Sequence, residues 1–146
     1  MLKDLLQVKR LTPESKLPTK GTEHSARYDF YAAEDVRLNP GDSCSISLGV
    51  ACAIPDDCVL ILKDKSGIAS KQPAGVIDAD YRGEIKALLT NHAICNRYIK
   101  VGRKIVQGII VNYKNFPITI EKFPIEEVSE LSETERGEGG FGSTGE

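Results

Sequence analysis

The sequence predicts an all-β fold, a jelly-roll-like β-barrel or sandwich, and three observations support that class. In residues 44–54 every even position is apolar, which is the alternation of a half-buried strand. Several other short segments are rich in strand-forming residues, and turn-forming residues separate them. No segment of ten or more residues repeats apolar side chains at helical spacing. Many short strands between regular turns are typical of such folds.

Five segments are expected to be strands, in the order 44–54, 58–63, 84–90, 104–113 and 118–123. Turn signals lie beside them, at Asn39-Pro40-Gly41-Asp42, Pro55-Asp56-Asp57, Arg82-Gly83 and Lys100-Val101-Gly102. The best helical candidates are short, around 67–71 or 126–135. No internal repeat or domain linker interrupts this pattern.

The length of 146 residues predicts one domain, which we assign to residues 1–135, followed by a distinct segment, 136–146. A formal net charge of −2 gives no reason to expect a nucleic acid or an anionic membrane as partner. No apolar run approaches the ~20 residues of a membrane helix. The four cysteines show no CxxC spacing, which favours buried thiols in a reducing cytoplasm. A nuclear or virion-associated location stays open.

The stretch GVIDADYRGE, residues 75–84, gathers three carboxylates around one tyrosine on what is expected to be a tight hairpin. Turn chemistry explains Asp80 and Arg82-Gly83 well. It explains Asp78 poorly, because this residue ends an apolar stretch. A carboxylate in that place is a candidate general base for activating water.

Two other segments carry candidate polar groups. Lys65-Ser66-Gly67 offers a charge, a hydroxyl and a glycine that could cradle phosphate oxygens, although seen alone it is more simply a charged turn. Gln107 is the odd polar residue in the apolar run KIVQGIIV. An amide there by default satisfies core backbone groups, and the alternative is that it faces a polar ligand.

The C-terminal segment RGEGGFGSTGE is rich in glycine, and its other side chains distinguish it from a plain linker. Glycine backbone can wrap closely around phosphate oxygens. Arg136 adds a charged donor, Ser143 and Thr144 add hydroxyls, and Phe141 offers a flat face for a base. The composition therefore predicts a flexible lid that closes over a nucleotide triphosphate.

Together these residues resemble the homotrimeric dUTPase family, whose five ordered motifs span nearly the whole chain. The matching stretches are ARYDF (26–30), KSGIA (65–69), GVID with YRG (75–83), GRKIVQ (102–107) and RGEGGFGSTG (136–145). The third and fifth are long and specific, and all five occur in order.

The resemblance implies a jelly-roll subunit in a homotrimer, with active sites shared so that Asp78, Gln107 and Arg136 of one site come from different subunits. It implies magnesium-dependent hydrolysis of dUTP to dUMP and pyrophosphate, with Asp78 activating the water. Tyr81 would pack under the deoxyribose, and backbone from Gly75 to Lys86 would read the uracil. The other implied contacts are phosphate binding by Lys65, Ser66, Gly67 and Gln107, magnesium binding through water by Asp29, and closure of the lid by Arg136, Phe141, Gly142, Ser143 and Thr144.

The chain departs from the usual family pattern at several positions. These are Arg27, Lys65, Lys86, Arg103, Lys104, Gly108 and the shortened segment 70–74. Lysine keeps a positive charge but lacks the planar fork of arginine, so phosphate contacts would differ from the usual ones.

Two alternatives remain beside the diphosphatase. One is a dCTP deaminase-like enzyme of the same fold, and the other is a non-catalytic dUTP-binding module that signals to a protein partner. The lid sequence and the Asp78–Tyr81 pair favour the diphosphatase.

Overall fold

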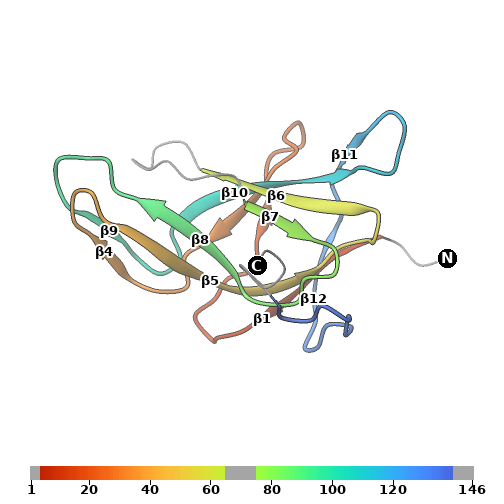
Figure 1. Cartoon of the computed structure of the whole chain (residues 1–146), viewed down its shortest axis with the longest axis horizontal. Coiled ribbons are helices and arrows are strands. Elements are labelled where there is room, and N and C mark those ends of the chain that lie inside the picture. The colour runs from red at the N-terminus through yellow and green to blue at the C-terminus, as the bar shows by residue number, and fades with distance from the viewer. Residues whose placement is uncertain (1–3, 65–74, 140–146) are drawn as a thin grey trace.

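The computed structural model describes residues 4–64 and 75–139, and within these ranges it contains only β-strands and connecting segments (Figure 1). The strands are β1 (Leu6–Arg10), β2 (Thr19–Lys20), β3 (Tyr28–Tyr31), β4 (Val36–Leu38), β5 (Ser43–Ala53), β6 (Cys58–Asp64), β7 (Gly75–Asp78), β8 (Ile85–Thr90), β9 (Arg97–Ile99), β10 (Lys104–Asn112), β11 (Thr119–Glu121) and β12 (Ile125–Glu127). The all-β prediction is confirmed.

Two sheets enclose the core, and they remain open at their edges rather than closing into a barrel. One has the strand order β12-β1-β5-β8, and the other has the order β2-β3-β10-β6-β7 with β11 paired to β10. Strands β4 and β9 form a separate ribbon at one end of the molecule (Figure 1). Buried apolar side chains from both large sheets meet in one cluster, among them Val8, Ile46, Phe30, Leu60 and Ile110. The described residues contain no helix that is long and apolar enough to cross a membrane.

The five strands expected from the sequence all form, within two residues of their expected ends. The short helix expected at 126–135 is wrong. Residues Ile125–Glu127 instead form β12, which runs parallel to β1, and bends follow it. Polar pairs between the two strands favour this arrangement, because Gln7 donates to Glu126 at 3.0 Å and Arg10 pairs with Glu127 at 2.8 Å. The other helical candidate, 67–71, lies outside the described residues.

Strand β10 is the central element of the larger sheet, because it pairs with β3 and β11 along one edge and with β6 along the other. Its Gln107 lies opposite Asp29 of β3 and Lys63 of β6. Near its far end, Val111 lies opposite Val59, which in turn lies opposite Asp78 of β7. Lys63 and Val59 are four positions apart, which is roughly 13 Å along a strand.

Strand β5 contains an irregularity at Gly49, where the chain packs closely against neighbouring segments. Its pairing with β8 shifts register between Ser47 and Val50, and Gly49 in the shifted segment has φ +67°. A Cβ at Gly49 would lie 2.5 Å from the Ser15 Cβ and 2.8 Å from the Ala33 Cβ. This position therefore requires glycine both for its left-handed backbone and for its lack of a side chain.

Substitution of Gly49 by alanine should destabilise the fold more than the same change at Gly41. Gly41 also has a positive φ, but a Cβ there meets nothing within 4 Å. Both variants carry a strain of about 1–2 kcal/mol from the left-handed backbone, and Gly49→Ala adds an overpacking penalty of about 1–3 kcal/mol. Urea denaturation measures both losses, and equal losses would contradict the packing argument.

Candidate active site

The carboxylate of Asp78 lies at the end of β7, on the outer face of the larger sheet. Its side chain is 56% exposed, whereas the preceding Ile77 is buried in the core. The backbone N–H of Tyr81 then donates to the Asp78 carbonyl at 3.1 Å, closing a turn. Strand β7 pairs with β6, whereas β8 pairs with β5. The expected two-stranded hairpin is therefore wrong, because residues 78–85 carry the chain from one sheet to the other.

The side chain of Tyr81 is held on two sides within this crossover. Its hydroxyl donates to the Glu84 carbonyl at 2.8 Å, and its ring is only 8% exposed. Gly83 leaves room for the ring, because a Cβ there would lie 2.4 Å from the Tyr81 hydroxyl oxygen. Burial raises the pKa of Tyr81, so the phenol stays protonated and acts as a hydrogen-bond donor.

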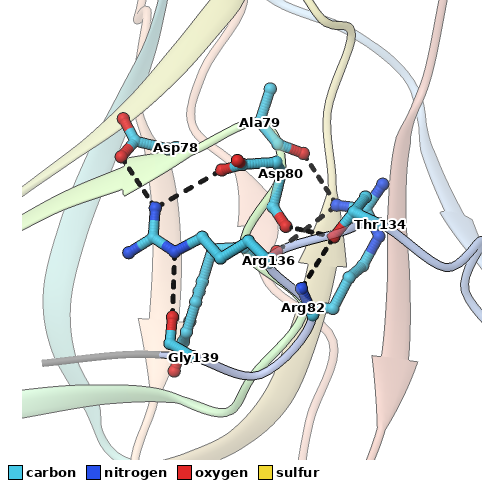
Figure 2. Close-up of polar contacts among 9 residues, drawn as sticks. Asp78, Ala79, Asp80, Arg82, Thr134, Arg136 and Gly139 are labelled. Carbon is cyan, nitrogen blue, oxygen red and sulfur yellow. Dashed lines mark hydrogen bonds and ion pairs between the residues drawn. The ribbon is translucent and has the colours of Figure 1, made fainter. Parts of the chain in front are cut away.

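Arg82 fastens the C-terminal segment to the crossover (Figure 2). Its Nε donates to the Ser132 carbonyl at 2.7 Å and its Nη1 donates to the Ala79 carbonyl at 2.7 Å. Its backbone N–H donates to the Gly137 carbonyl at 2.7 Å. In the same place the Thr134 hydroxyl donates to the Asp80 carbonyl. Residues 132–139 are thereby folded against residues 78–82 of their own chain.

Arg136 belongs to this segment and points its guanidinium at two carboxylates (Figure 2). Its Nη1 lies 2.9 Å from the Asp78 Oδ2 and 3.3 Å from the Asp80 Oδ1, and its Nε donates to the Gly139 carbonyl at 2.8 Å. The guanidinium carbon also lies 5.2 Å from the centre of the Tyr81 ring. The hydrogen bond to Asp78 raises the pKa of Arg136 further above its ordinary value. Within this chain Arg136 thus contacts its own Asp78, whereas the family resemblance implies that the two residues of one site come from different subunits.

A cleft of about 870 Å³ opens beside these residues. Four carboxylates line it, from Asp56, Asp78, Asp80 and Glu135, and Arg136 is the cation among its described lining residues. This balance repels a polyanion, so a triphosphate needs further positive charge to bind here.

A second polar group lies on the outer face of the same sheet, at the opposite end of β6 and β10. Asp29 of β3 is 2% exposed, and its carboxylate lies 3.3 Å from Arg27 Nε and 3.8 Å from Lys104 Nζ. The half-buried Gln107 lies opposite it on β10, and the exposed Lys63 follows on β6. Arg27 and Lys104, two departures from the usual family pattern, both contact this aspartate.

The described residues fit only one kind of magnesium site. They contain no group of three histidine, cysteine or acidic side chains that could cage a metal ion. Magnesium is commonly held by one or two carboxylates together with substrate phosphates. Asp29 can supply one such carboxylate, while its two cationic neighbours leave it little charge to hold an ion alone. The site therefore suits a magnesium ion that arrives on a polyphosphate.

The cysteine thiols take no part in either group of polar residues. All four are free, Cys52 and Cys58 are buried, and burial raises the pKa of each of these two thiols to about 12. They remain protonated at neutral pH and are poor nucleophiles.

The structure brings some of the predicted site residues together and separates others. Asp78, Tyr81 and Arg136 form one group, and Asp29 and Gln107 form another. The two groups lie on opposite sides of β6 and near its opposite ends, because Asp78 lies opposite Val59 and Gln107 lies opposite Lys63. Gly75 begins β7 opposite Leu62, and the exposed Lys86 on β8 lies 3.8 Å from Glu84. The remaining predicted residues, Lys65, Ser66, Gly67, Phe141, Gly142, Ser143 and Thr144, lie outside the described residues.

Sequence reasoning missed several residues of the cleft. The sequence predicts only a turn-forming role for Asp80, whereas in the structure its carboxylate is a second acceptor for Arg136. Asp56 belongs to an expected turn, and Tyr113 to the end of an expected strand, yet both line the cleft. The Asp-x-Asp spacing of 78 and 80 was the available signal for the first. The other two come from segments distant in sequence, so no local pattern marks them.

Comparison with known proteins finds the same family throughout. A family model described as dUTPase matches residues 13–145. The deoxyuridine 5'-triphosphate nucleotidohydrolase of Clostridium tetani is 38% identical, covering 96% of both chains, and that of Candida albicans is 40% identical, covering 96% of this chain and 87% of the other. Among solved structures, the Staphylococcus bacteriophage 80alpha dUTPase with dUpNHpp matches with a TM-score of 0.70 and 29% identity, covering 96% of this chain and 98% of that one. A phage phi11 dUTPase, whose structure concerns the coordination of a structural Mg(II) ion, matches with a TM-score of 0.69 and 25% identity, covering 89% of this chain and 96% of that one.

Arginine-to-alanine substitutions at positions 82 and 136 should have different effects on stability. Arg82 donates to carbonyls that anchor the C-terminal segment, and hydrogen bonds from a charged group contribute about 1.5–3 kcal/mol. The carbonyl partner of Arg136, Gly139, belongs to the same segment and does not tie it to residues 78–82. The carboxylate partners of Arg136 are more than half exposed, and such ion pairs contribute about 0–1 kcal/mol. Chemical denaturation should therefore show a larger loss for Arg82→Ala than for Arg136→Ala. The reverse order would mean that the ion pair anchors the segment.

Proposed function

Because the chain belongs to the dUTPase family, we propose that it hydrolyses dUTP to dUMP and pyrophosphate, with Asp78 activating the attacking water. The observation that carries this proposal is the exposed Asp78 carboxylate, which lines a cleft close to the buried Tyr81. Both residues fall within the range that the dUTPase family model matches.

Asp78 has the exposure that a general base requires. A water molecule beside it can donate one proton to the carboxylate while its oxygen attacks the α-phosphorus. A phosphorus–oxygen bond forms to the water, and the bond to the bridging oxygen of the β-phosphate breaks. Pyrophosphate leaves, and the proton remains on Asp78 until it passes to solvent. The Arg136 guanidinium must release the Asp78 carboxylate for this step. It can then bind the γ-phosphate, which carries more negative charge than a carboxylate.

Tyr81 has the rigidity required to discriminate between sugars. Its ring is held by the hydroxyl bond to Glu84 and by the close approach of Gly83. A deoxyribose packed on the ring leaves no room for a ribose 2'-hydroxyl. The backbone from Gly75 to Lys86 then offers N–H and C=O groups to the uracil edge.

The phosphates require the positive charges that the cleft itself lacks. We assign their binding to Lys65, Ser66, Gly67 and Gln107, with Lys63 and Lys104 close to Gln107 in the sheet. A magnesium ion bound to the phosphates would neutralise part of their charge, and Asp29 would hold it through water. The segment that contains Phe141, Gly142, Ser143 and Thr144 would close over the nucleotide and exclude bulk water.

We further propose that the active enzyme is a homotrimer with sites shared between chains. In one chain the Asp78 group and the Gln107 group lie on the same sheet face but at opposite ends of β6, roughly 13 Å apart along the strand direction. One group is acidic, and the other carries Lys63, Lys104 and Arg27. A site that joins the acidic end of one chain to the basic end of another would supply both the base and the phosphate-binding charges.

The surface between these two groups suits contact with further copies of the chain. It consists of outward-facing apolar residues on four adjacent strands, Val59, Ile61, Val76, Ile109, Val111 and Ile120, which we term the outer apolar face. Val76 is 60% exposed on β7, the edge strand of this sheet, where it lies opposite Ile61 of β6. Copies packed on this face would place Asp78 and Gln107 of different chains along one interface.

Product analysis separates this function from its two alternatives. Chromatography after incubation with dUTP should show dUMP and pyrophosphate. Release of ammonia from dCTP would instead indicate a deaminase, and tight dUTP binding without turnover would indicate a binding module.

Replacing Asp78 by asparagine should remove the base while keeping the shape of the side chain. A general base contributes about 10²–10⁴-fold, so kcat should fall by that factor with a smaller change in KM. Pyrophosphate release measures the effect, with thermal unfolding as the control for folding. Turnover at the wild-type rate would exclude Asp78 from this role.

A charge on the outer apolar face should weaken the trimer. Light scattering should give the wild type a mass about three times that of the 16.0 kDa chain. Val76→Asp should shift the mass toward one chain, because its carboxylate would be buried without a partner. Leu88→Asp is the matched control, since Leu88 is 50% exposed on β8 of the other sheet. A Val76→Asp trimer as stable as the wild type would contradict the proposed interface.

A further inference from the structure

Ser47 lies beside the register shift of β5 and is bonded through its backbone and its side chain. Its backbone N–H donates to the Glu34 carboxylate at 2.8 Å, and its carbonyl accepts from the Ala33 N–H at 2.9 Å. Its hydroxyl oxygen accepts from the Gly49 N–H at 3.0 Å. These hydrogen bonds to Ala33, Glu34 and Gly49 fix the position of the serine.

The hydroxyl proton of Ser47 is directed at Glu84. Because the Gly49 N–H can only donate, the serine hydroxyl acts as acceptor there and has its own proton available. That proton is donated to the Glu84 carboxylate in a short hydrogen bond. A bond between a hydroxyl and a carboxylate is charge-assisted and stronger than a neutral one. Lys86 Nζ lies 3.8 Å from the other carboxylate oxygen of Glu84.

Glu84 in turn sets the orientation of Tyr81. The Tyr81 hydroxyl donates to the Glu84 carbonyl at 2.8 Å, and burial raises the pKa of the phenol, which keeps this donor in place. The phenol occupies the space that a side chain at Gly83 would fill, since a Cβ there would lie 2.4 Å from the Tyr81 hydroxyl oxygen. The chain of contacts Ser47–Glu84–Tyr81 thus connects the irregular part of β5 to the tyrosine of the candidate site.

We propose that Ser47 is a positioning residue that sets the selectivity of this enzyme for deoxyribose over ribose. It acts through Glu84, whose carbonyl fixes the angle of the Tyr81 ring. The inference rests on the proposed function, in which Tyr81 excludes a 2'-hydroxyl.

Loss of the Ser47 hydroxyl should affect UTP and dUTP differently. Steric exclusion of one oxygen atom depends on ring placement within about 1 Å, and a displacement of that size can change rates by about 10²-fold. A tilted ring would admit the ribose, whereas the smaller deoxyribose would still bind beside it. The expected signature is a rise in UTP hydrolysis with little change for dUTP, which a general loss of stability would not produce.

The test measures kcat/KM for dUTP and for UTP in the full-length enzyme. For Ser47→Ala we expect the ratio of the two values to fall about tenfold, with kcat for dUTP within about threefold of wild type. Ser47→Thr keeps the hydroxyl and should retain the wild-type ratio. Tyr81→Phe removes the hydroxyl that donates to the Glu84 carbonyl and should lower the ratio by a similar factor. In the double variant Ser47→Ala/Tyr81→Phe the ratio should fall no further than in either single variant.

Ser43→Ala is the matched control on the same pair of strands. The Ser43 hydroxyl lies 2.7 Å from the Thr90 hydroxyl across β5 and β8, at a distance from Tyr81. Its removal deletes an equivalent cross-strand bond and should leave the ratio unchanged. Should Ser47→Ala fold poorly in thermal unfolding, Glu84→Gln keeps the side-chain volume, weakens the same bond, and should lower the ratio in the same direction.

Three results would overturn this inference while leaving the proposed function intact. They are a wild-type ratio in both Ser47→Ala and Glu84→Gln, an equal fall in Ser43→Ala, and additive effects of Ser47→Ala and Tyr81→Phe, which would mean that the two residues act independently. A wild-type enzyme that hydrolyses UTP and dUTP equally well is a different result. It would remove the role proposed for Tyr81 and the inference with it.

Discussion

The pairing of β10 with β3 and β6 is the constraint on which the site depends. It places Asp29, Gln107 and Lys63 in one row across the sheet, whereas the pairing of β7 with β6 places Asp78 opposite Val59, near the other end of β6. A slip of one residue would turn Gln107 into the core and a buried apolar side chain out to solvent. The register therefore fixes both the composition of each polar group and the separation between them. A single chain cannot remove that separation without breaking the sheet.

In the proposed shared site, the charges of the two polar groups complement each other. The Asp78 cleft carries four carboxylates, which suit a base but repel a triphosphate. The Asp29 group carries cations that suit phosphates, and in the described residues it offers no exposed carboxylate comparable to Asp78. Arg136 is the exception, since it neutralises part of the cleft by contacting Asp78 and Asp80 of its own chain. We interpret this contact as the ligand-free position of a group that later binds phosphate.

The sequence was sufficient to predict the strands whose alternation reports one buried face, such as β5, and the apolar strands β6 and β10. The sequence was misleading where polar contacts or pairing with distant strands decide which secondary structure forms and which sheet a strand joins. Residues 126–135 have helical composition, but Gln7 and Arg10 bind Glu126 and Glu127 and favour a strand. The 75–84 stretch has the residues of a hairpin, yet β7 and β8 join different sheets because each pairs with a distant strand. Asp78, Tyr81 and Arg136 could be named from local motifs. Their mutual contacts, and the cleft residues Asp56 and Tyr113, depend on tertiary structure that no local pattern encodes.

Mixed trimers test the sharing of sites between chains most directly. Asp78→Asn and Gln107→Glu chains, each inactive alone, are refolded together in equal amounts, and mass spectrometry establishes that mixed trimers form. If each site takes Asp78 from one chain and Gln107 from another, random mixing restores about a quarter of the sites, because both residues are intact in that share. Pyrophosphate release near a quarter of the wild-type rate is the predicted result. Mixed trimers as inactive as their parents would show that each chain supplies both residues to its own site.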